Sequence, residues 1–145
     1  MAPTPPSDGG GSVFRVAVAD DDRNVLAALG GLVDDEPRLE LRGTFADGFG
    51  LLDCCRREHL DAALIDIAMP GGGPDLARDI RAACPDTIVV VHTAHGDRRN
   101  REAMLAAGAA AILHKGRTLD VTGALLDLLQ RPTDAPDGDA SGPRP

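Results

Sequence analysis

The sequence predicts an α/β protein, folded as a three-layer α/β/α sandwich around a parallel sheet. Between residues 13 and 130, short apolar runs alternate five times with amphipathic stretches, the strand and helix order that such a sheet requires. The runs at 62–66 and 87–93 each contain four consecutive apolar residues, 62–65 and 88–91, as in strands buried on both faces. Several runs end in acidic, hydroxyl or basic residues, which predicts polar chemistry at one edge of the sheet.

The first half of the domain is expected to hold two strands and two helices. Residues 14–19 form a run dense in Val and Ala that predicts the first strand. Asp22 is expected to cap a helix over 24–33, where apolar residues recur at helical spacing. Residues 39–45 alternate in polarity and predict a strand near an edge of the sheet, followed by a helix over 47–59.

The second half is expected to hold three strands and three helices. The run 62–66 predicts a central strand, and 75–83 predicts a helix with its apolar residues on one face. Residues 87–93 are the most β-branched run and predict the fourth strand. The spacing over 98–107 predicts a helix that ends at Gly108. The remaining strand and helix are expected at 110–114 and 119–129.

Composition and charge disfavour several classes of function. The 145 residues suit one domain at 13–130, and the Pro-, Gly- and Ser-rich ends, 1–12 and 131–145, are expected to be disordered tails. A net charge of −8 disfavours binding to nucleic acid or to an anionic membrane. No apolar run reaches the ~18 residues of a membrane span, and no signal-peptide pattern opens the chain. The three cysteines lack metal-type spacing and are expected to be core residues in the reducing cytoplasm.

Polar residues follow four of the predicted strands. Asp20 and Asp21 follow the first strand, and Asp66 ends the third, because an unpaired carboxylate inside a strand core would be costly. Thr93 ends the fourth strand, and Lys115 follows the fifth. Because parallel strands end at the same edge of a sheet, we expect these side chains to converge on one pocket.

Such a pocket predicts phosphoryl-accepting chemistry. Two like charges ~4 Å apart repel by about 4 kcal/mol at an effective dielectric constant of about 20, so Asp20, Asp21 and Asp66 together need a cation. Oxygen ligands without cysteine indicate Mg²⁺, which also accepts phosphate oxygens. An aspartate beside Mg²⁺ can act as the nucleophile and form an acyl phosphate, whose negative charge a lysine and the cation would neutralise.

Four segments at strand ends carry a resemblance to a known family. They are 16–21, 64–70, 91–94 and 108–115. Together they closely resemble the receiver domain of two-component response regulators, phosphoproteins of phosphorelay signal transduction. The resemblance covers 13–130 and implies a flavodoxin-like fold with a five-stranded parallel sheet of order 2-1-3-4-5.

The resemblance also implies a role for each site residue. Asp66 would accept the phosphoryl group. Asp21 and Asp66 would be direct Mg²⁺ ligands, joined by the main-chain carbonyl of Ala68, and Asp20 would assist through water. Mg²⁺ is therefore the expected cofactor.

The same resemblance implies roles for Thr93 and Lys115 and predicts the partners of the chain. Thr93 would hydrogen-bond the phosphoryl group and move toward it, and Lys115 would pair with one of its oxygens. A sensor histidine kinase or a phosphotransfer protein would be the donor, and the chain would catalyse only its own phosphorylation and dephosphorylation rather than act as an enzyme. A homodimer or output partner is expected on the face formed by the predicted helix, strand and helix at 98–107, 110–114 and 119–129.

The sequence departs from the family pattern at several positions. Ile112 stands where the family usually has Tyr or Phe, so the aromatic part of its switch cannot operate as usual. Gly116 replaces the usual proline after the lysine and loosens that turn. Ala68 cannot hydrogen-bond a water that attacks the acyl phosphate, whereas His95 could. His92 is expected to be packed and hydrogen-bonded within the fourth strand.

Two other readings stay open at this point. A receiver-like protein-interaction module that acts without phosphorylation is favoured by Ile112 and Gly116 and disfavoured by the complete set of acids and Lys115. A haloacid-dehalogenase-type phosphatase would use the acids after the first strand as its nucleophile. It would also need an acidic pair after its lysine, and within the domain, up to residue 130, only Asp120 and Asp127 follow Lys115, both in the last predicted helix.

Overall fold

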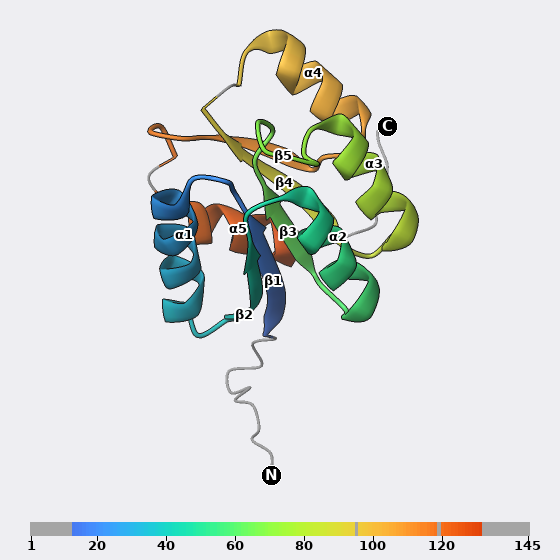
Figure 1. Cartoon of the computed structure of the whole chain (residues 1–145). Coiled ribbons are helices and arrows are strands. Elements are labelled where there is room, and N and C mark those ends of the chain that lie inside the picture. Colours follow the sequence, from blue (N-terminus) through green and yellow to red (C-terminus); the bar gives the residue numbers. More distant parts are fainter. Residues whose placement is uncertain (1–12, 95, 119, 132–145) are drawn as a thin grey trace.

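A computed structural model describes residues 13–94, 96–118 and 120–131 (Figure 1). The strands are β1 (Phe14–Ala19), β2 (Leu39–Phe45), β3 (Ala62–Ile65), β4 (Ile88–Thr93) and β5 (Ala111–His114). The helices are α1 (Arg23–Asp35), α2 (Gly48–Arg57), α3 (Pro74–Ala83), α4 (Arg98–Ala106) and α5 (Val121–Gln130). His95, Leu119, the expected tail at 1–12 and all of the expected tail at 131–145 except Arg131 lie outside the described residues.

The five strands form one parallel sheet in the order β2-β1-β3-β4-β5, as predicted. Each predicted strand and helix is present, and most of their ends differ from the prediction by one or two residues. The predicted strand 62–66 stops at Ile65, one residue before Asp66. The predicted helix 47–59 stops at Arg57, because Glu58 adopts an extended backbone.

The sheet separates two apolar cores. On one face α1 and α5 pack against residues such as Val16 and Leu64, and on the other α2, α3 and α4 pack against residues such as Ile65 and Val91. Successive residues of β3 alternate between these cores, and all four are fully buried. Both faces of the central strand are therefore covered by helices, which explains why its sequence shows no polar alternation.

Aspartates begin four of the five helices. The Asp22 carboxylate accepts main-chain hydrogen bonds from Asn24 and Val25, which confirms the predicted cap of α1. Equivalent caps begin α2, α4 and α5 at Asp47, Asp97 and Asp120. Helix α3 has no side-chain cap and follows Gly73 instead, whose φ of 82° is a conformation that glycine favours.

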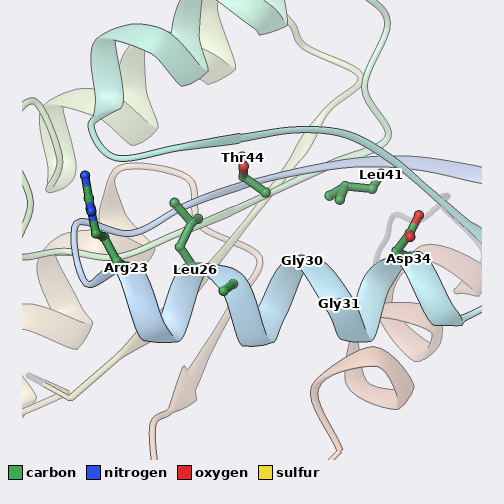
Figure 2. Close-up of a pocket in the computed structure, with 8 residues that line it drawn as sticks. Arg23, Leu26, Gly30, Gly31, Asp34, Leu41 and Thr44 are labelled. Atoms are coloured by element: carbon green, nitrogen blue, oxygen red, sulfur yellow. The ribbon is translucent and has the colours of Figure 1, made fainter.

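A cavity of about 360 Å³ opens between α1 and β2 (Figure 2). Gly30 faces the strand there, and a Cβ atom at this position would lie 3.2 Å from Cγ2 of Thr44. The residues that line the cavity include none of Asp20, Asp21 and Asp66. The cavity is therefore not part of the predicted site.

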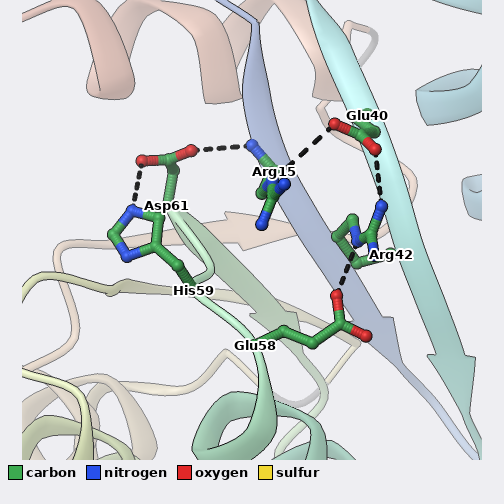
Figure 3. A network of polar contacts seen from close by, with 6 residues as sticks. All are labelled: Arg15, Glu40, Arg42, Glu58, His59 and Asp61. Carbon is green, nitrogen blue, oxygen red and sulfur yellow. Dashed lines mark hydrogen bonds and ion pairs between the residues drawn. The ribbon is translucent and has the colours of Figure 1, made fainter. Parts of the chain in front are cut away.

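Charged side chains form a network around the amino ends of β1, β2 and β3 (Figure 3). The main-chain N–H of Arg15 donates to Asp61 at 2.7 Å, and the Arg42 guanidinium donates to Glu58 at 2.7 Å. The network also includes Glu40 and His59. Among the described residues, no helix is long and apolar enough to cross a bilayer.

Candidate functional site

The predicted site residues lie at the carboxyl ends of four adjacent strands. Asp20 directly follows β1, and Asp66 directly follows β3, with its main-chain N–H donating to Ala19 at 3.2 Å. Thr93 is the last residue of β4 and is fully buried. The main-chain N–H of Lys115 donates to Thr93 at 2.9 Å. Because the strands are parallel, these residues meet at one edge of the sheet, as the sequence predicts.

Three carboxylates form a cluster in this position. Asp20, Asp21 and Asp66 each place one carboxylate oxygen so that all three atoms lie within 4.8 Å of one another. Asp20 and Asp66 are 1% and 4% exposed, whereas Asp21 is exposed to solvent. Asp22, the next residue, lies outside the cluster and caps α1. The cluster is therefore buried on the sheet side and open at Asp21.

Lys115 brings one positive charge to the cluster. Its Nζ lies 2.7 Å from Oδ2 of Asp20 and 3.3 Å from Oδ2 of Asp66. Burial lowers the pKa of Lys115, but the hydrogen bond to Asp20 and the charges of Asp66 and Asp20 outweigh it and raise the pKa overall. Lys115 is therefore an ammonium ion at neutral pH.

The donor set fits a hard divalent cation. Oδ1 of Asp66 is buried and has no hydrogen-bond partner among the described residues, which is costly for a carboxylate oxygen. One lysine faces three carboxylates, so positive charge is missing from the pocket. A Mg²⁺ ion takes oxygen ligands, keeps several waters and would satisfy both needs.

The loop after Asp66 carries the expected carbonyl ligand, Ala68. Within this loop the main-chain N–H of Gly72 donates to Met69 at 2.9 Å. The loop is also bound to α2, because the main-chain N–H of Gly48 donates to the carbonyl oxygen of Pro70 at 2.8 Å. The sequence gives no sign of this contact, because it depends on how closely α2 approaches the loop.

His92 differs from its prediction. It is buried in β4, 8% exposed, but its Nδ1 has no hydrogen-bond partner in the described part of the chain. The prediction of a packed residue is confirmed, and the prediction of a hydrogen-bonded ring is wrong at Nδ1. Burial and the nearby Lys115 charge lower the pKa of His92, while Asp20 and Asp66 act in the opposite sense.

Ile112 occupies the position of the family's usual aromatic residue. It is partly buried and packs against the core formed with α2, α3 and α4. A cavity of about 210 Å³ adjoins it, lined also by Gly96, Arg101, His114 and Arg117. The cysteines are free, with Cys54 and Cys55 in the core as predicted and Cys84 partly buried.

Comparison with known proteins agrees with this geometry. The family model of the response regulator receiver domain matches residues 16–124. The chain is 29% identical over 105 residues to response regulator UvrY of Escherichia coli (strain K12), covering 72% of this chain and 48% of UvrY. It is 34% identical over 117 residues to a protein-glutamate methylesterase/protein-glutamine glutaminase of Rhodopseudomonas palustris, covering 79% of this chain and 32% of the relative.

A solved structure has the same fold. The signal receiver domain of the putative response regulator NarL from Mycobacterium tuberculosis superposes with a TM-score of 0.76 at 28% identity, covering 81% of this chain and 97% of that domain. The chain spans about half the length of UvrY and about a third of the length of the methylesterase. The protein therefore belongs to the response regulator receiver domain family.

Proposed function

We propose that this chain accepts a phosphoryl group on Asp66 and passes the signal on by a change of conformation. The observation that carries the proposal is the convergence of three carboxylates within 4.8 Å with the Lys115 ammonium, 2.7 Å from Asp20 and 3.3 Å from Asp66. We assign this phosphoryl-accepting activity to a receiver domain that spans residues 13–130. Its membership of the receiver family supports the proposal.

The residues would divide the work as follows. Asp66 would attack the phosphorus of a phosphohistidine, so that an O–P bond forms while the N–P bond breaks and the histidine keeps the electron pair. Lys115 would hold one phosphoryl oxygen and Thr93 another, which stabilises charge where it develops. Asp21, Asp66 and the main-chain carbonyl of Ala68 would hold Mg²⁺, with Asp20 acting through water. Bound Mg²⁺ would supply positive charge to the oxygens of the transferring group.

The expected donor is a sensor histidine kinase or a phosphotransfer protein, and the expected compartment is the cytoplasm. Three free thiols are consistent with a reducing compartment. The acyl phosphate carries nearly two negative charges where the Asp66 carboxylate carried one, and this added charge beside Asp20 biases the chain between two conformations. The response is read by a partner or output domain, and we place that surface on α4, β5 and α5. The chain would act as a switch and would turn over no substrate other than its own acyl phosphate.

Mass spectrometry after incubation with acetyl phosphate and Mg²⁺ tests the proposal. The chain should gain the mass of one phosphoryl group, and Asp66→Asn should gain none. Asp22→Asn is the matched control, because Asn also caps helices and Asp22 lies outside the cluster, so this variant should be phosphorylated normally.

One other function is favoured by a specific observation. Ile112 packs into the core where an aromatic side chain would report phosphorylation, which favours an interaction module that needs no phosphoryl group. The same experiment decides between the two. Absence of a phosphoryl adduct in the unmodified chain, with donor and Mg²⁺ in excess, would favour the interaction module.

A further inference from the structure

Two cysteines from distant segments meet at the opposite edge of the sheet from Asp66. Cys55 lies near the end of α2, and Cys84 is the residue that ends α3. The Cys84 thiol donates a hydrogen bond to the main-chain carbonyl oxygen of Cys55, with an S···O distance of 3.1 Å. The proposed phosphoryl chemistry uses neither of these cysteines.

Solvent reaches this pair through a cavity of about 190 Å³ that both cysteines line. Glu58 and His59, which belong to the charged network of Figure 3, also line it. Cys84 is partly exposed and Cys55 is 4% exposed, so Cys84 is the thiol that first meets a solute. Cys54 is 1% exposed and does not line the cavity.

We propose that Cys55 and Cys84 form a reversible disulfide when the protein meets a peroxide. A disulfide needs side chains that already approach closely, and its geometry is incompatible with distant or diverging cysteines. Here the Cys84 sulfur already touches the main chain of Cys55. Cys84 also ends α3, and its neighbours Pro85 and Asp86 are exposed, so a small adjustment there disturbs little packing.

The reaction has two balanced steps. The Cys84 sulfur attacks one oxygen of the peroxide, the O–O bond breaks, and one water leaves with the thiol proton, which oxidises Cys84 to a sulfenic acid. The Cys55 sulfur then attacks the Cys84 sulfur, the S–O bond breaks, and the Cys55 proton leaves with the hydroxide as a second water. The two thiols lose two electrons, and the peroxide gains them. Burial, with neighbouring Cys84 and Cys54, raises the pKa of Cys55 to about 12, so Cys55 is a poor first nucleophile and Cys84 is the thiol that reacts with the peroxide.

Hydrogen peroxide on the reduced full chain, followed by blocking of free thiols and mass spectrometry without reductant, tests the proposal. The monomer should lose the mass of two hydrogen atoms and retain one blockable thiol. Trypsin should then release peptide 43–56 joined to peptide 82–98, and a reductant should separate them. Because Cys54 and Cys55 share peptide 43–56, variants must identify the partner.

Cys54→Ala is the matched control and should still form the link, whereas Cys55→Ala and Cys84→Ser should not. Peroxide should raise the thermal midpoint of the parent and of Cys54→Ala by about 5–15 °C, and leave that of Cys84→Ser unchanged. Cys84→Ser changes a partly exposed residue, so it decides the matter even where Cys55→Ala does not fold. Addition of oxygen atoms without a cross-link, or a link retained in Cys84→Ser, would overturn the proposal.

Discussion

The pocket at the carboxyl edge of the sheet holds more negative than positive charge. Lys115 lies close to Asp20 and Asp66, and Asp21 adds a third carboxylate to the cluster. Removal of Lys115 would leave buried carboxylates unpaired, a change that typically costs 3–5 kcal/mol, or about 4 kcal/mol here. Lys115 therefore offsets part of the negative charge of the pocket, and a bound cation would offset more of it.

His92 should give the protein a pH-dependent stability in mild acid. In the folded chain, burial and the charge of Lys115 lower the pKa of His92. Below about pH 6.5 the unfolded chain therefore binds a proton at His92 more readily than the folded chain does. The free energy of unfolding should therefore fall as the pH drops from 6.5 toward the lowered pKa, by at most about 1.4 kcal/mol per pH unit.

Urea unfolding at pH 7.5 and at pH 5, in Mg²⁺-free buffer, measures this effect. His92→Gln should lose less stability between the two pH values than the parent. His59→Gln removes an exposed histidine and should behave like the parent. Equal losses in His92→Gln and the parent would show that His92 does not titrate differently on folding.

At the scale of elements, the start of α2 positions the loop that follows Asp66. A Cβ atom added to Gly48 would lie 1.9 Å from the main-chain oxygen of Gly71 and 2.6 Å from its carbonyl carbon. No side chain fits there without displacing main chain. The close approach lets Gly48 donate its main-chain hydrogen bond to Pro70, so helix and loop are held as one unit.

Gly48→Ala should therefore destabilise the protein by about 2 kcal/mol and weaken Mg²⁺ binding, because Ala68 belongs to the displaced loop. Gly31→Ala is the matched control. It lies on α1 with no atom within 4 Å of the added Cβ, and it should stabilise the chain by about 0.5–1 kcal/mol through helix propensity. Urea unfolding with and without Mg²⁺ measures both effects. Unchanged Mg²⁺ binding in Gly48→Ala would show that the position of this loop does not affect the cation site.

The elements themselves were largely predictable from the sequence. Apolar runs such as 87–93 and helix caps such as Asp22 depend on local chemistry, so they indicate strands and helix starts directly. Parallel order then requires Asp20, Asp66 and Lys115 to converge. Two features were not predictable: the His92 Nδ1 that has no partner within the described part of the chain, and the close approach at Gly48. Both depend on rotamers and on packing between elements.

For the whole molecule, a bound cation should raise stability. A ligand that binds only the folded chain adds about 1.4 kcal/mol to the free energy of unfolding at ten times its Kd. Mg²⁺ should therefore raise the thermal midpoint, and EDTA should reverse the rise. Asp21→Ala should lose most of the effect, while Asp86→Ala removes an exposed acid in a turn away from the cluster and should keep it. A midpoint that does not respond to Mg²⁺ would contradict the proposed metal site.

The position of β2 affects how readily the sheet could associate with another molecule of the protein. It is the outermost strand on one side of the sheet, so its unpaired main-chain groups could template a strand from another molecule. Glu40 and Arg42 place opposite charges on this strand and pair with each other. Such charges act as gatekeepers against edge-to-edge aggregation. Glu40 and Arg42, which belong to the surface network, therefore disfavour the addition of a strand from another molecule at this edge of the sheet.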